Sequence, residues 1–196
     1  IHYHANSEQA DSLLNEIQEM GVRAMKVQAD ITEEESVFAM RDAIKRTLGS
    51  PHIIVNNAVI QYPWSSVLEQ SIDDYESQFR SCVLQNVLMA KAFAPDMIKE
   101  KYGRIIAINS ECSMQNLPGQ SAYVSGKRGM DGVLRVLARE IGEHHITVNQ
   151  VAPGWTISDK ERNYKPLIQR QNPYAKSVPL RRRAEDQEIA HTVVFL

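Results

Sequence analysis

The stretch that decides the fold class is Ile53-Ile54-Val55-Asn56-Asn57-Ala58. Its first three residues form a short continuous apolar run, which is typical of a strand that is covered on both faces. Residues 104–108, Arg-Ile-Ile-Ala-Ile, form a second run of this kind. Residues 146–151, Ile-Thr-Val-Asn-Gln-Val, suit a further strand that stops before Pro153 and Gly154. These patterns predict the strands of a buried parallel sheet.

Helical patterns lie between these strands. Apolar residues at helical spacing follow Ser7, which can cap a helix, and continue to Gly21. Thr32 and Glu35 form a capping-box pattern before a second helix, which Gly49 closes. Two more strands are expected, one that ends at Tyr3 and one over residues 22–29. Three more helices are expected over residues 71–101, 122–142 and 184–196. Strands that alternate with helices predict an α/β fold, in which helices cover both faces of a doubly wound parallel sheet.

We expect residues 1–196 to form a single domain. The sequence contains no repeat, low-complexity segment or interdomain linker. Residues 155–183 contain Pro166, Pro173 and Pro179. They are interpreted as an insert on the substrate side, or a lid over a site, because strong patterning resumes after them.

The composition excludes several classes of protein. The chain has 196 residues, of which 43% are hydrophobic and 23% charged, and this is enough to bury a sizeable core. Lysine and arginine number 22 against 24 aspartates and glutamates, so a net charge of −2 argues against a nucleic acid as the main partner. The lack of an apolar run of about twenty residues argues against a membrane span. The presence of only two cysteines and the lack of a signal-peptide pattern favour the cytoplasm.

Polar and small residues follow each predicted strand. In an open parallel sheet, ligands bind at the carboxyl ends of the strands, so these positions are candidates for a site. The residues at the tips are Tyr3-His4-Ala5-Asn6-Ser7, Asp30, Asn56-Asn57-Ala58, Asn109-Ser110 and Pro153-Gly154-Trp155-Thr156. Small side chains at such tips let a ligand approach the backbone.

Tyr123 and Lys127 lie four residues apart at the start of the helix expected over residues 122–142. This spacing places both side chains on one face of the helix. A cation beside a phenol lowers the pKa of the phenol, which a tyrosine acid or base needs near neutral pH. Ser110, at the end of an earlier strand, could hydrogen-bond the substrate oxygen with which such a tyrosine exchanges its proton. Taken alone, such a pair is more often an ordinary surface feature of a helix.

The whole constellation is more specific than the pair. The motifs Asn56-Asn57-Ala58, Ser110, Tyr123 with Lys127, and Pro153-Gly154 occur in this order and on these elements. In this arrangement the chain resembles the short-chain dehydrogenase/reductase family over essentially its whole length. The branch that contains 3-oxoacyl-carrier-protein reductases and small sugar or alcohol dehydrogenases is similar in two further stretches, Gly103-Arg104-Ile105-Ile106 and Gly119-Gln120-Ser121-Ala122-Tyr123.

The resemblance implies an oxidoreductase that transfers a hydride between a nicotinamide cofactor and the carbonyl or carbinol carbon of a small substrate. Tyr123 would then be the general acid in reduction and the base in oxidation. Lys127 would hold the nicotinamide ribose and lower the pKa of Tyr123, and Ser110 would orient the substrate oxygen. The other residues that the resemblance assigns to the cofactor are Asp30 and Ile31 at the adenine, Asn57 and Ala58 along the channel, and Pro153, Gly154, Thr156 and Ser158 at the nicotinamide.

The choice between the two nicotinamide cofactors is argued from charge. A site specific for NAD needs a carboxylate at the end of the strand that precedes Asn6, where it binds the ribose 2′-hydroxyl and repels a 2′-phosphate. No acid occurs there before Glu8, while Asn6 and Ser7 can hydrogen-bond a phosphate at a helix N-terminus. We therefore expect NADP(H) to be favoured over NAD(H). The alternative is that Asn6 and Ser7 are ordinary helix-capping residues.

Three features depart from the family pattern. The glycine-rich turn that binds pyrophosphate is absent, and Ile1 stands where the family has its second strand. We expect the sequence to be the ordered part of a longer chain, whose first strand with this turn and last strand are missing from it. Cys82 occupies the place of an asparagine that the family joins through water to the active-site lysine, and Asn86 lies one helical turn further on. Val59 stands where the family usually has glycine, which narrows the nearby space.

Three other features allow both a functional and an ordinary interpretation. His2 and His4 share a strand face, but no further ligand is close in sequence, so no metal site is expected. The triplet Arg181-Arg182-Arg183 could hold a phosphate, although a solvated basic turn is the better interpretation. Trp64 and Trp155 follow strand tips and could wall a pocket or simply pack.

The leading hypothesis is an NADP(H)-dependent carbonyl reductase or alcohol dehydrogenase. The alternative is a catalytically impaired relative that binds a nucleotide or a partner protein. Cys82 and the missing glycine-rich turn keep this alternative open, whereas Ser110, Tyr123 and Lys127 favour catalysis. The expected partners are a small carbonyl or alcohol substrate and further copies of the chain in a tetramer or dimer, with no nucleic acid and no membrane.

Overall fold

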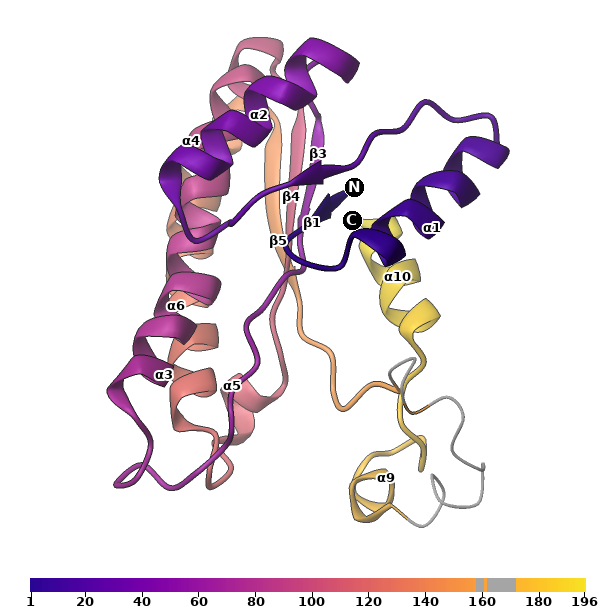
Figure 1. The fold of residues 1–196 in the computed structure, drawn as a ribbon. Coiled ribbons are helices and arrows are strands. Elements are labelled where there is room, and N and C mark those ends of the chain that lie inside the picture. Colours follow the sequence, from indigo (N-terminus) through magenta and orange to yellow (C-terminus); the bar gives the residue numbers. More distant parts are fainter. Residues whose placement is uncertain (158–160, 162–171) are drawn as a thin grey trace.

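The computed structural model describes residues 1–157, 161 and 172–196, so Ser158 lies outside the described residues. Figure 1 shows the described elements. In chain order they are β1 (His2–Tyr3), α1 (Ser7–Glu19), β2 (Val27–Gln28), α2 (Glu34–Leu48), β3 (Ile53–Asn56), α3 (Ile72–Gln78), η1 (Phe79–Leu84), α4 (Gln85–Glu100), β4 (Gly103–Ile108), α5 (Cys112–Gln115), α6 (Ser121–Ile141), η2 (Gly142–His144), β5 (Ile146–Val151), α9 (Pro173–Ser177) and α10 (Asp186–Phe195).

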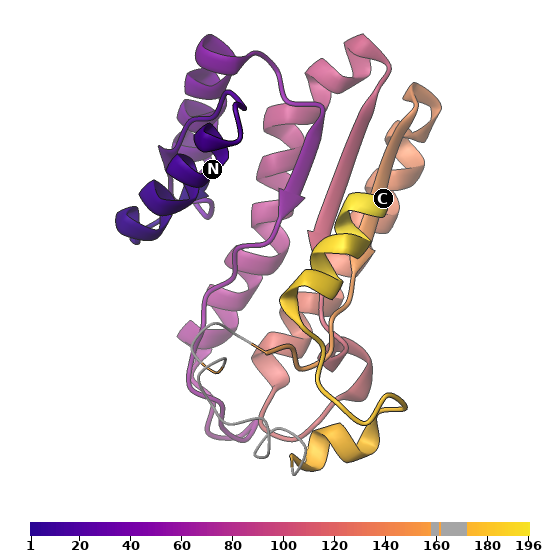
Figure 2. The same ribbon diagram turned by 90° about the vertical axis from the view of Figure 1, so that its right-hand side faces the viewer.

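All of these strands pair in parallel. β1 pairs with β2, and β4 lies between β3 and β5. In register, Ile53 lies opposite Arg104, and Gly103 lies opposite Ile146. Helices lie on both sides of the strands, with α2, α4 and α6 on one face and α1 and α10 on the other (Figure 1 and Figure 2). The predicted α/β class with a doubly wound parallel sheet is confirmed.

The two groups of strands are not hydrogen-bonded to each other within the described residues. A cavity of about 360 Å³ lies between them, lined by Ile1 and His2 on one side and by residues 53–58 on the other. Ile53 and Val55 are 56% and 45% exposed, although they belong to an apolar strand.

The apolar core fixes the helices of one face against β4. Phe93 and Met97 of α4 pack with Ile105 of β4 in one cluster, and all three are nearly inaccessible to water. Cys82 of η1 and Met130 of α6 belong to a second cluster beside the end of β4. Burial of this apolar surface is the main favourable contribution to folding. It brings the first turns of α6 close to the carboxyl end of β4.

The helix expected over residues 71–101 is present, but its middle is not α-helical. Ser71 caps its start by accepting a hydrogen bond from the backbone N–H of Asp74. Between α3 and α4, the segment η1 is π-helical. A π-helical turn holds an extra residue and is often found at functional sites. Because the extra residue disturbs the apolar pattern only locally, the periodicity of the sequence does not reveal it.

Several predicted element boundaries are wrong for local reasons. Asn6, not Ser7, caps α1, because the Asn6 side chain accepts a hydrogen bond from the backbone N–H three residues later. Thr32 forms no capping box, since its N–H and its hydroxyl both donate to Asp30 and α2 begins two residues later. The strand expected over residues 22–29 shortens to β2.

The C-terminal helix α10 begins with a capping box that the sequence did not predict. The Glu185 side chain accepts from the backbone N–H of Glu188, whose side chain in turn accepts from the backbone N–H of Glu185. None of its residues is buried, and Val194 and Phe195 are 85% and 87% exposed. Among the described residues, neither this helix nor any other is long and apolar enough to cross a membrane.

Candidate active site

The carboxyl ends of β3, β4 and β5 meet at one edge of the sheet. The backbone N–H of Asn109 donates to the carbonyl oxygen of Val151 at 2.7 Å. The backbone N–H of Glu111 donates to the carbonyl oxygen of Pro153 at 2.9 Å. These bonds extend the parallel β4–β5 ladder into the following loops. They hold Ser110 beside the turn that follows β5.

Tyr123 and Lys127 reach this edge from the first turns of α6. The backbone N–H of Tyr123 donates to the hydroxyl of Tyr62 at 2.6 Å, which ties the start of the helix to the loop after β3. The Ser110 side chain is close enough to the Tyr123 hydroxyl for hydrogen bonding between them to act on the pKa of the phenol. The Lys127 ammonium donates to the carbonyl oxygen of Ile108 at 2.6 Å and lies 5.6 Å from the centroid of the Tyr123 ring. The structure therefore brings the three candidate catalytic residues together.

Two glycines let α6 approach η1 closely. A Cβ atom on Gly126 would lie 2.9 Å from a backbone carbonyl oxygen of α3 and 3.2 Å from the Cβ atom of Cys82. A Cβ atom on Gly129 would lie 2.8 Å from a methyl group of η1. In a close-packed interior such contacts force neighbouring groups apart. The missing side chains thus set the depth at which the site residues of α6 lie.

Burial governs the protonation of the tyrosine–lysine pair. It raises the pKa of Tyr123 above the ordinary value, and the hydrogen bond with Ser110 opposes this shift only in part. Burial also lowers the pKa of Lys127, which is 4% exposed. The expectation that the pKa of Tyr123 is lowered is therefore wrong. Desolvation is the largest effect on both groups, and it favours the neutral phenol.

Cys82 and Asn86 have different tasks. The Asn86 amide donates to the carbonyl oxygen of Cys82 at 2.7 Å and accepts from the amide of Asn56 at 2.8 Å. Asn86 therefore closes the π-helical turn and ties it to the end of β3. Cys82 packs against Gly126, the residue before Lys127, and burial raises the pKa of its thiol. Cys82, which the resemblance places at the family's asparagine, thus carries a neutral thiol.

A cavity of about 730 Å³ opens beside Ser110 and Tyr123. Trp64 and Trp155 form part of its wall and are 53% and 49% exposed. The Trp64 ring lies 6.4 Å from the Tyr123 ring between centroids. Both tryptophans thus have the pocket-wall position considered from the sequence. Other described lining residues include Gln61, Glu111, Gln115, Leu117, Gln120 and Tyr174.

One wall of this cavity is built over Gly154. A Cβ atom on Gly154 would overlap the hydroxyl of Tyr174 and would lie 3.1 Å from the carboxyl group of Glu111. The Tyr174 hydroxyl accepts a hydrogen bond from the backbone N–H of Trp155 at 3.0 Å. It is also hydrogen-bonded to Glu111, and this bond adds to burial in raising the pKa of Tyr174. Only glycine leaves room for this arrangement.

The strand tips fit the nicotinamide half of a dinucleotide. Lys127 has three N–H donors, and the described residues accept from one of them, which leaves donors for ribose hydroxyls. Asn57 and Ala58 are exposed beyond β3, while Pro153 and Thr156 are half-buried beyond β5. These residues and Gly154 lie at the carboxyl ends of β3 and β5.

The residues assigned to the adenine half lie near the ends of β1 and β2, and most of them have partners. Two hydrogen bonds from the following turn hold the pKa of Asp30 below its ordinary value. Ile31 lines the 360 Å³ cavity. Asn6 caps α1, so the ordinary interpretation of this residue is correct.

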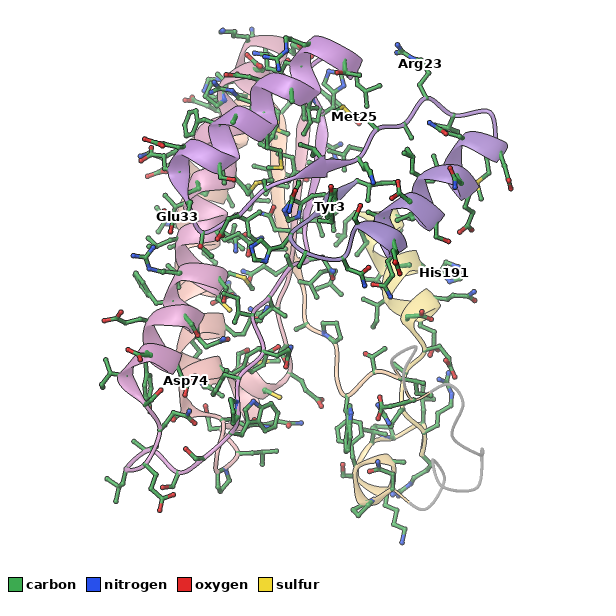
Figure 3. The ribbon with its side chains drawn as sticks, in the orientation of Figure 1. Tyr3, Arg23, Met25, Glu33, Asp74 and His191 are labelled. Carbon is green, nitrogen blue, oxygen red and sulfur yellow. The ribbon has the colours of Figure 1, made fainter. Side chains whose placement is uncertain are left out.

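A lysine that the sequence did not single out lies beside Ser7. The Lys26 ammonium donates to the Ser7 hydroxyl at 2.9 Å and pairs with Asp11 at 2.6 Å. It lies 5.4 Å from the centroid of the Tyr3 ring, at the end of β1 near the centre of Figure 3. The Lys26 charge at the β1 tip is therefore paired with the carboxylate of Asp11, which also accepts a hydrogen bond from the Ser7 hydroxyl.

The two N-terminal histidines bind neighbouring backbone and carboxylate groups. The Nε2 atom of His2 lies 2.9 Å from the carbonyl oxygen of Ala29, and that of His4 lies 3.8 Å from Asp30. In the part of the chain that the structure describes, no group of three His, Cys, Asp or Glu residues could hold a metal ion.

Arg183 departs from the interpretation of its triplet as a solvated turn. It is 5% exposed. Its guanidinium donates to the carbonyl oxygens of Trp155 and Thr156 and pairs with the carboxylate of Glu161 at 2.7 Å. It also lies 4.4 Å from the centroid of the Trp155 ring. Arg183 thus holds the segment that follows Gly154, and the solvated interpretation is wrong for this residue.

The sequence did not single out Glu111 or Gln120 as site residues. Their places in the sequence could have indicated them, because Glu111 follows Ser110 directly and Gln120 precedes the first turn of α6. Tyr174 lies in residues 155–183, which the sequence identifies only as an insert on the substrate side. Its contact with Glu111 joins segments far apart in the chain, which local patterns cannot predict.

Comparison with known proteins supports this arrangement. The family model described as Enoyl-(Acyl carrier protein) reductase matches residues 1–196. The chain is 31% identical over 198 residues to 3-oxoacyl-[acyl-carrier-protein] reductase FabG of Staphylococcus epidermidis, with 100% of this chain and 79% of that protein covered. It is 35% identical over 188 residues to the FabG reductase of Pseudomonas aeruginosa, with 95% and 74% covered. A crystal structure of NAD+-bound xylitol dehydrogenase matches with a TM-score of 0.86 at 26% identity, covering 97% of this chain and 79% of that one.

Proposed function

Since the chain belongs to the short-chain dehydrogenase/reductase family and is an NAD(P)-dependent oxidoreductase, we propose that it interconverts a small alcohol and its carbonyl compound with Tyr123 as the acid–base residue. The observation that carries this proposal is that Ser110 and Tyr123 lie together in the wall of the 730 Å³ cavity, with the Lys127 ammonium 5.6 Å from the centroid of the Tyr123 ring.

The chemistry follows from these three side chains. The nicotinamide cofactor supplies the hydride in reduction and accepts it in oxidation. Tyr123 is a neutral phenol at neutral pH, because burial raises its pKa, and it gives its proton to the carbonyl oxygen of the substrate. Ser110 donates to the same oxygen and holds it near the phenol. Lys127, anchored to Ile108, holds the ribose with its remaining donors.

The remaining cofactor residues follow the strand tips. Asn57 and Ala58 would line the channel, and Pro153, Gly154, Thr156 and Ser158 would bind the nicotinamide side. Asp30 and Ile31 would lie at the adenine. Residues 155–183 would form the substrate-side segment of the single domain.

We favour NADP(H) over NAD(H) as the cofactor. The lack of an acid between Tyr3 and Glu8 supports a site that tolerates a 2′-phosphate. The Lys26 ammonium beside Ser7 adds a donor there, and its charge is paired with Asp11. The solved relative holds NAD+, which is a property of that protein. The ratio of kcat/KM for NADPH to that for NADH tests this preference, and a ratio below one contradicts it.

The alternative, a catalytically impaired relative, is not favoured, because the similar proteins are reductases and a dehydrogenase. The feature that kept it open is Cys82, which the resemblance places at the family's asparagine and whose thiol is a poor hydrogen-bonding group. The bond from Asn86 to the Cys82 carbonyl keeps the π-helical turn closed without that asparagine. The complete set of Ser110, Tyr123 and Lys127 therefore supports catalysis.

The proposed partners are a small substrate and further copies of the chain, in the cytoplasm. An apolar groove of about 580 Å³ runs between α4 and α6 and includes Val87, Ala94 and Val133. Val136 of this groove is 56% exposed. A second copy packed on these helices would bury this surface, in a dimer or tetramer. The particle mass from light scattering tests this assembly.

The proposed function is tested by NADPH oxidation against a panel of carbonyl compounds. Tyr123→Phe removes the proton donor and should lower kcat by about a hundredfold or more. Tyr102→Phe is the matched control, because Tyr102 is 46% exposed at the opposite end of β4. Full activity of Tyr123→Phe would contradict the proposal.

A further inference from the structure

The substrate cavity carries a carboxylate in its wall. Glu111 follows Ser110 directly, and its backbone N–H is fixed to the carbonyl oxygen of Pro153 at 2.9 Å. Its side chain is half-buried and stands over Gly154, where a Cβ atom would lie 3.1 Å from Glu111 Oε1. Glu111 and Tyr123 line the same cavity. A negative charge therefore faces the space that receives the substrate.

Tyr174 orients this carboxylate. The Tyr174 oxygen accepts the backbone N–H of Trp155 at 3.0 Å, so the phenolic proton is free to be donated to Glu111. A carboxylate has about four acceptor positions. Tyr174 Oη and Glu111 Oε1 both lie beside the place where a Gly154 Cβ would stand, and hydrogen bonding between the two side chains raises the pKa of Tyr174. Further acceptor positions on Glu111 remain for a ligand.

These acceptor positions discriminate between substrates. An acyl chain would leave them without a donor in a half-buried wall, which is unfavourable. A substrate carboxylate would be repelled. A substrate hydroxyl satisfies them by donating a hydrogen bond.

The other polar groups of the cavity favour a hydroxyl over an ammonium group. Gln61 and Gln115 line the cavity, and their amides can both donate and accept. A hydroxyl can also do both, whereas an ammonium group only donates. Gln120 is 6% exposed, and its Oε1 atom has no hydrogen-bond partner within the described residues. It is a further acceptor beside a cavity that suits several hydroxyl groups.

We propose that Glu111, oriented by Tyr174, is a specificity-determining residue that accepts a hydrogen bond from a substrate hydroxyl next to the reacting carbon. The substrate class is then small polyhydroxylated alcohols and their ketones, not 3-oxoacyl thioesters. This inference rests on the proposed function and names the substrate class of the same site. In oxidation, the carbinol carbon loses a hydride to the oxidised nicotinamide and its hydroxyl loses a proton to the Tyr123 phenolate, so that a carbon–oxygen double bond forms. Glu111 binds a neighbouring hydroxyl and transfers no proton.

The test compares two substrate classes on the full-length protein. We would measure kcat and KM for xylitol and D-sorbitol with NAD+ and NADP+, and for acetoacetyl-CoA with NADH and NADPH. The variants are Glu111→Gln, which keeps the shape, Glu111→Leu, which removes all acceptors, and Tyr174→Phe, which removes the orienting bond. The matched control is Glu143→Gln, since the Glu143 side chain is 79% exposed in η2. Cofactor binding and thermal unfolding show that each variant is folded.

The wild type should prefer the polyols. Loss of a hydrogen bond to a charged group should lower kcat/KM for polyols about tenfold to a hundredfold in Glu111→Leu, mainly through KM, and less in Glu111→Gln. Activity with acetoacetyl-CoA should stay the same or rise. Tyr174→Phe should raise the KM for polyols in the same direction, and Glu143→Gln should change neither class.

An unchanged ratio of polyol to thioester activity in Glu111→Leu would overturn the inference. A wild type that turns over acetoacetyl-CoA but no polyol would also overturn it, while the proposed function would stand. Full activity of Tyr123→Phe would instead contradict the proposed function. These outcomes separate the failure of one from the failure of the other.

Discussion

The close approach of α6 to η1 predicts that Gly126 cannot be replaced by alanine without loss. A Cβ atom there would lie 2.9 Å from a backbone carbonyl oxygen and 3.2 Å from Cys82. To reach an ordinary contact distance of about 3.4 Å, the helix must move away by roughly half an ångström. Lys127 is the next residue, so this movement displaces its ammonium from the carbonyl oxygen of Ile108.

The size of the effect follows from two opposing contributions. Alanine is a better helix former than glycine by about 1 kcal/mol, which stabilises the fold. Overpacking of a close contact costs about 1–3 kcal/mol. Gly126→Ala should therefore lower the free energy of unfolding by about 0–2 kcal/mol. Displacement of the site should lower kcat/KM about tenfold, since a misplacement of 1 Å can cost about a hundredfold.

Gly132→Ala is the matched control on the same helix. No atom lies within 4 Å of the place where its Cβ would stand, so the variant keeps the gain in helix propensity without the overpacking. Denaturant unfolding of both variants should differ by about 1–3 kcal/mol, the cost of the contact alone. Light scattering checks that the control has not altered assembly. Equal stability and equal activity of the two variants would refute the argument that Gly126 sets the depth of the site.

Three further predictions follow from charge and burial. Burial holds the pKa of Tyr123 above its ordinary value, so kcat/KM for alcohol oxidation should still rise at pH 9 and above. For reduction, kcat/KM should stay flat from about pH 6 to 9. A plateau of the oxidation rate near pH 7 would contradict this prediction. Arg182 lowers the pKa of Glu188 from 4.5 to about 2, so this pair stabilises the fold above pH 4.5 and the stabilisation is lost as the pH falls toward 2. In denaturant unfolding, Glu188→Gln should reduce the fall in the free energy of unfolding over this pH range. An unchanged fall would exclude the pair as its cause. Arg183→Met should lower the free energy of unfolding by about 1–3 kcal/mol. Arg181 is exposed, so Arg181→Met should change the free energy of unfolding by less than about 0.5 kcal/mol. Equal effects would show that the buried contacts of Arg183 contribute nothing.

The strands could be predicted because their apolar runs are continuous. Residues 146–151 form β5 as expected, and β4 begins one residue before the expected start at Arg104. Runs of this kind are specific, since buried parallel strands lack the alternation of half-exposed ones. The two-residue strands β1 and β2 have no such run, so their bounds depend on pairing that the sequence does not display.

The part of the candidate site that lies at the strand ends and in the first turns of α6 could be predicted. Ser110, Tyr123 and Lys127 lie at fixed places on predicted elements, so their convergence follows from the topology. The protonation of Tyr123 was not predictable, because desolvation depends on the packing around it. Glu111 and its contact with Tyr174 likewise depend on tertiary folding.

The buried arginine illustrates the same limit. Charge runs are usually solvated, which made a basic turn the natural interpretation of the triplet. In the fold, the last arginine finds the Glu161 carboxylate and two backbone carbonyl oxygens, so Arg183 is buried with its charge compensated. None of these partners is near it in sequence.

The most direct test of the central claim separates binding from chemistry in Tyr123→Phe. Cofactor affinity, measured by titration of NADPH fluorescence, should match the wild type, because Lys127 and the strand tips are unchanged. The rate of the reduction step in a single turnover should fall by about a hundredfold or more, since the proton donor is lost. A single-turnover rate equal to that of the wild type would contradict the assignment of Tyr123 as the acid–base residue.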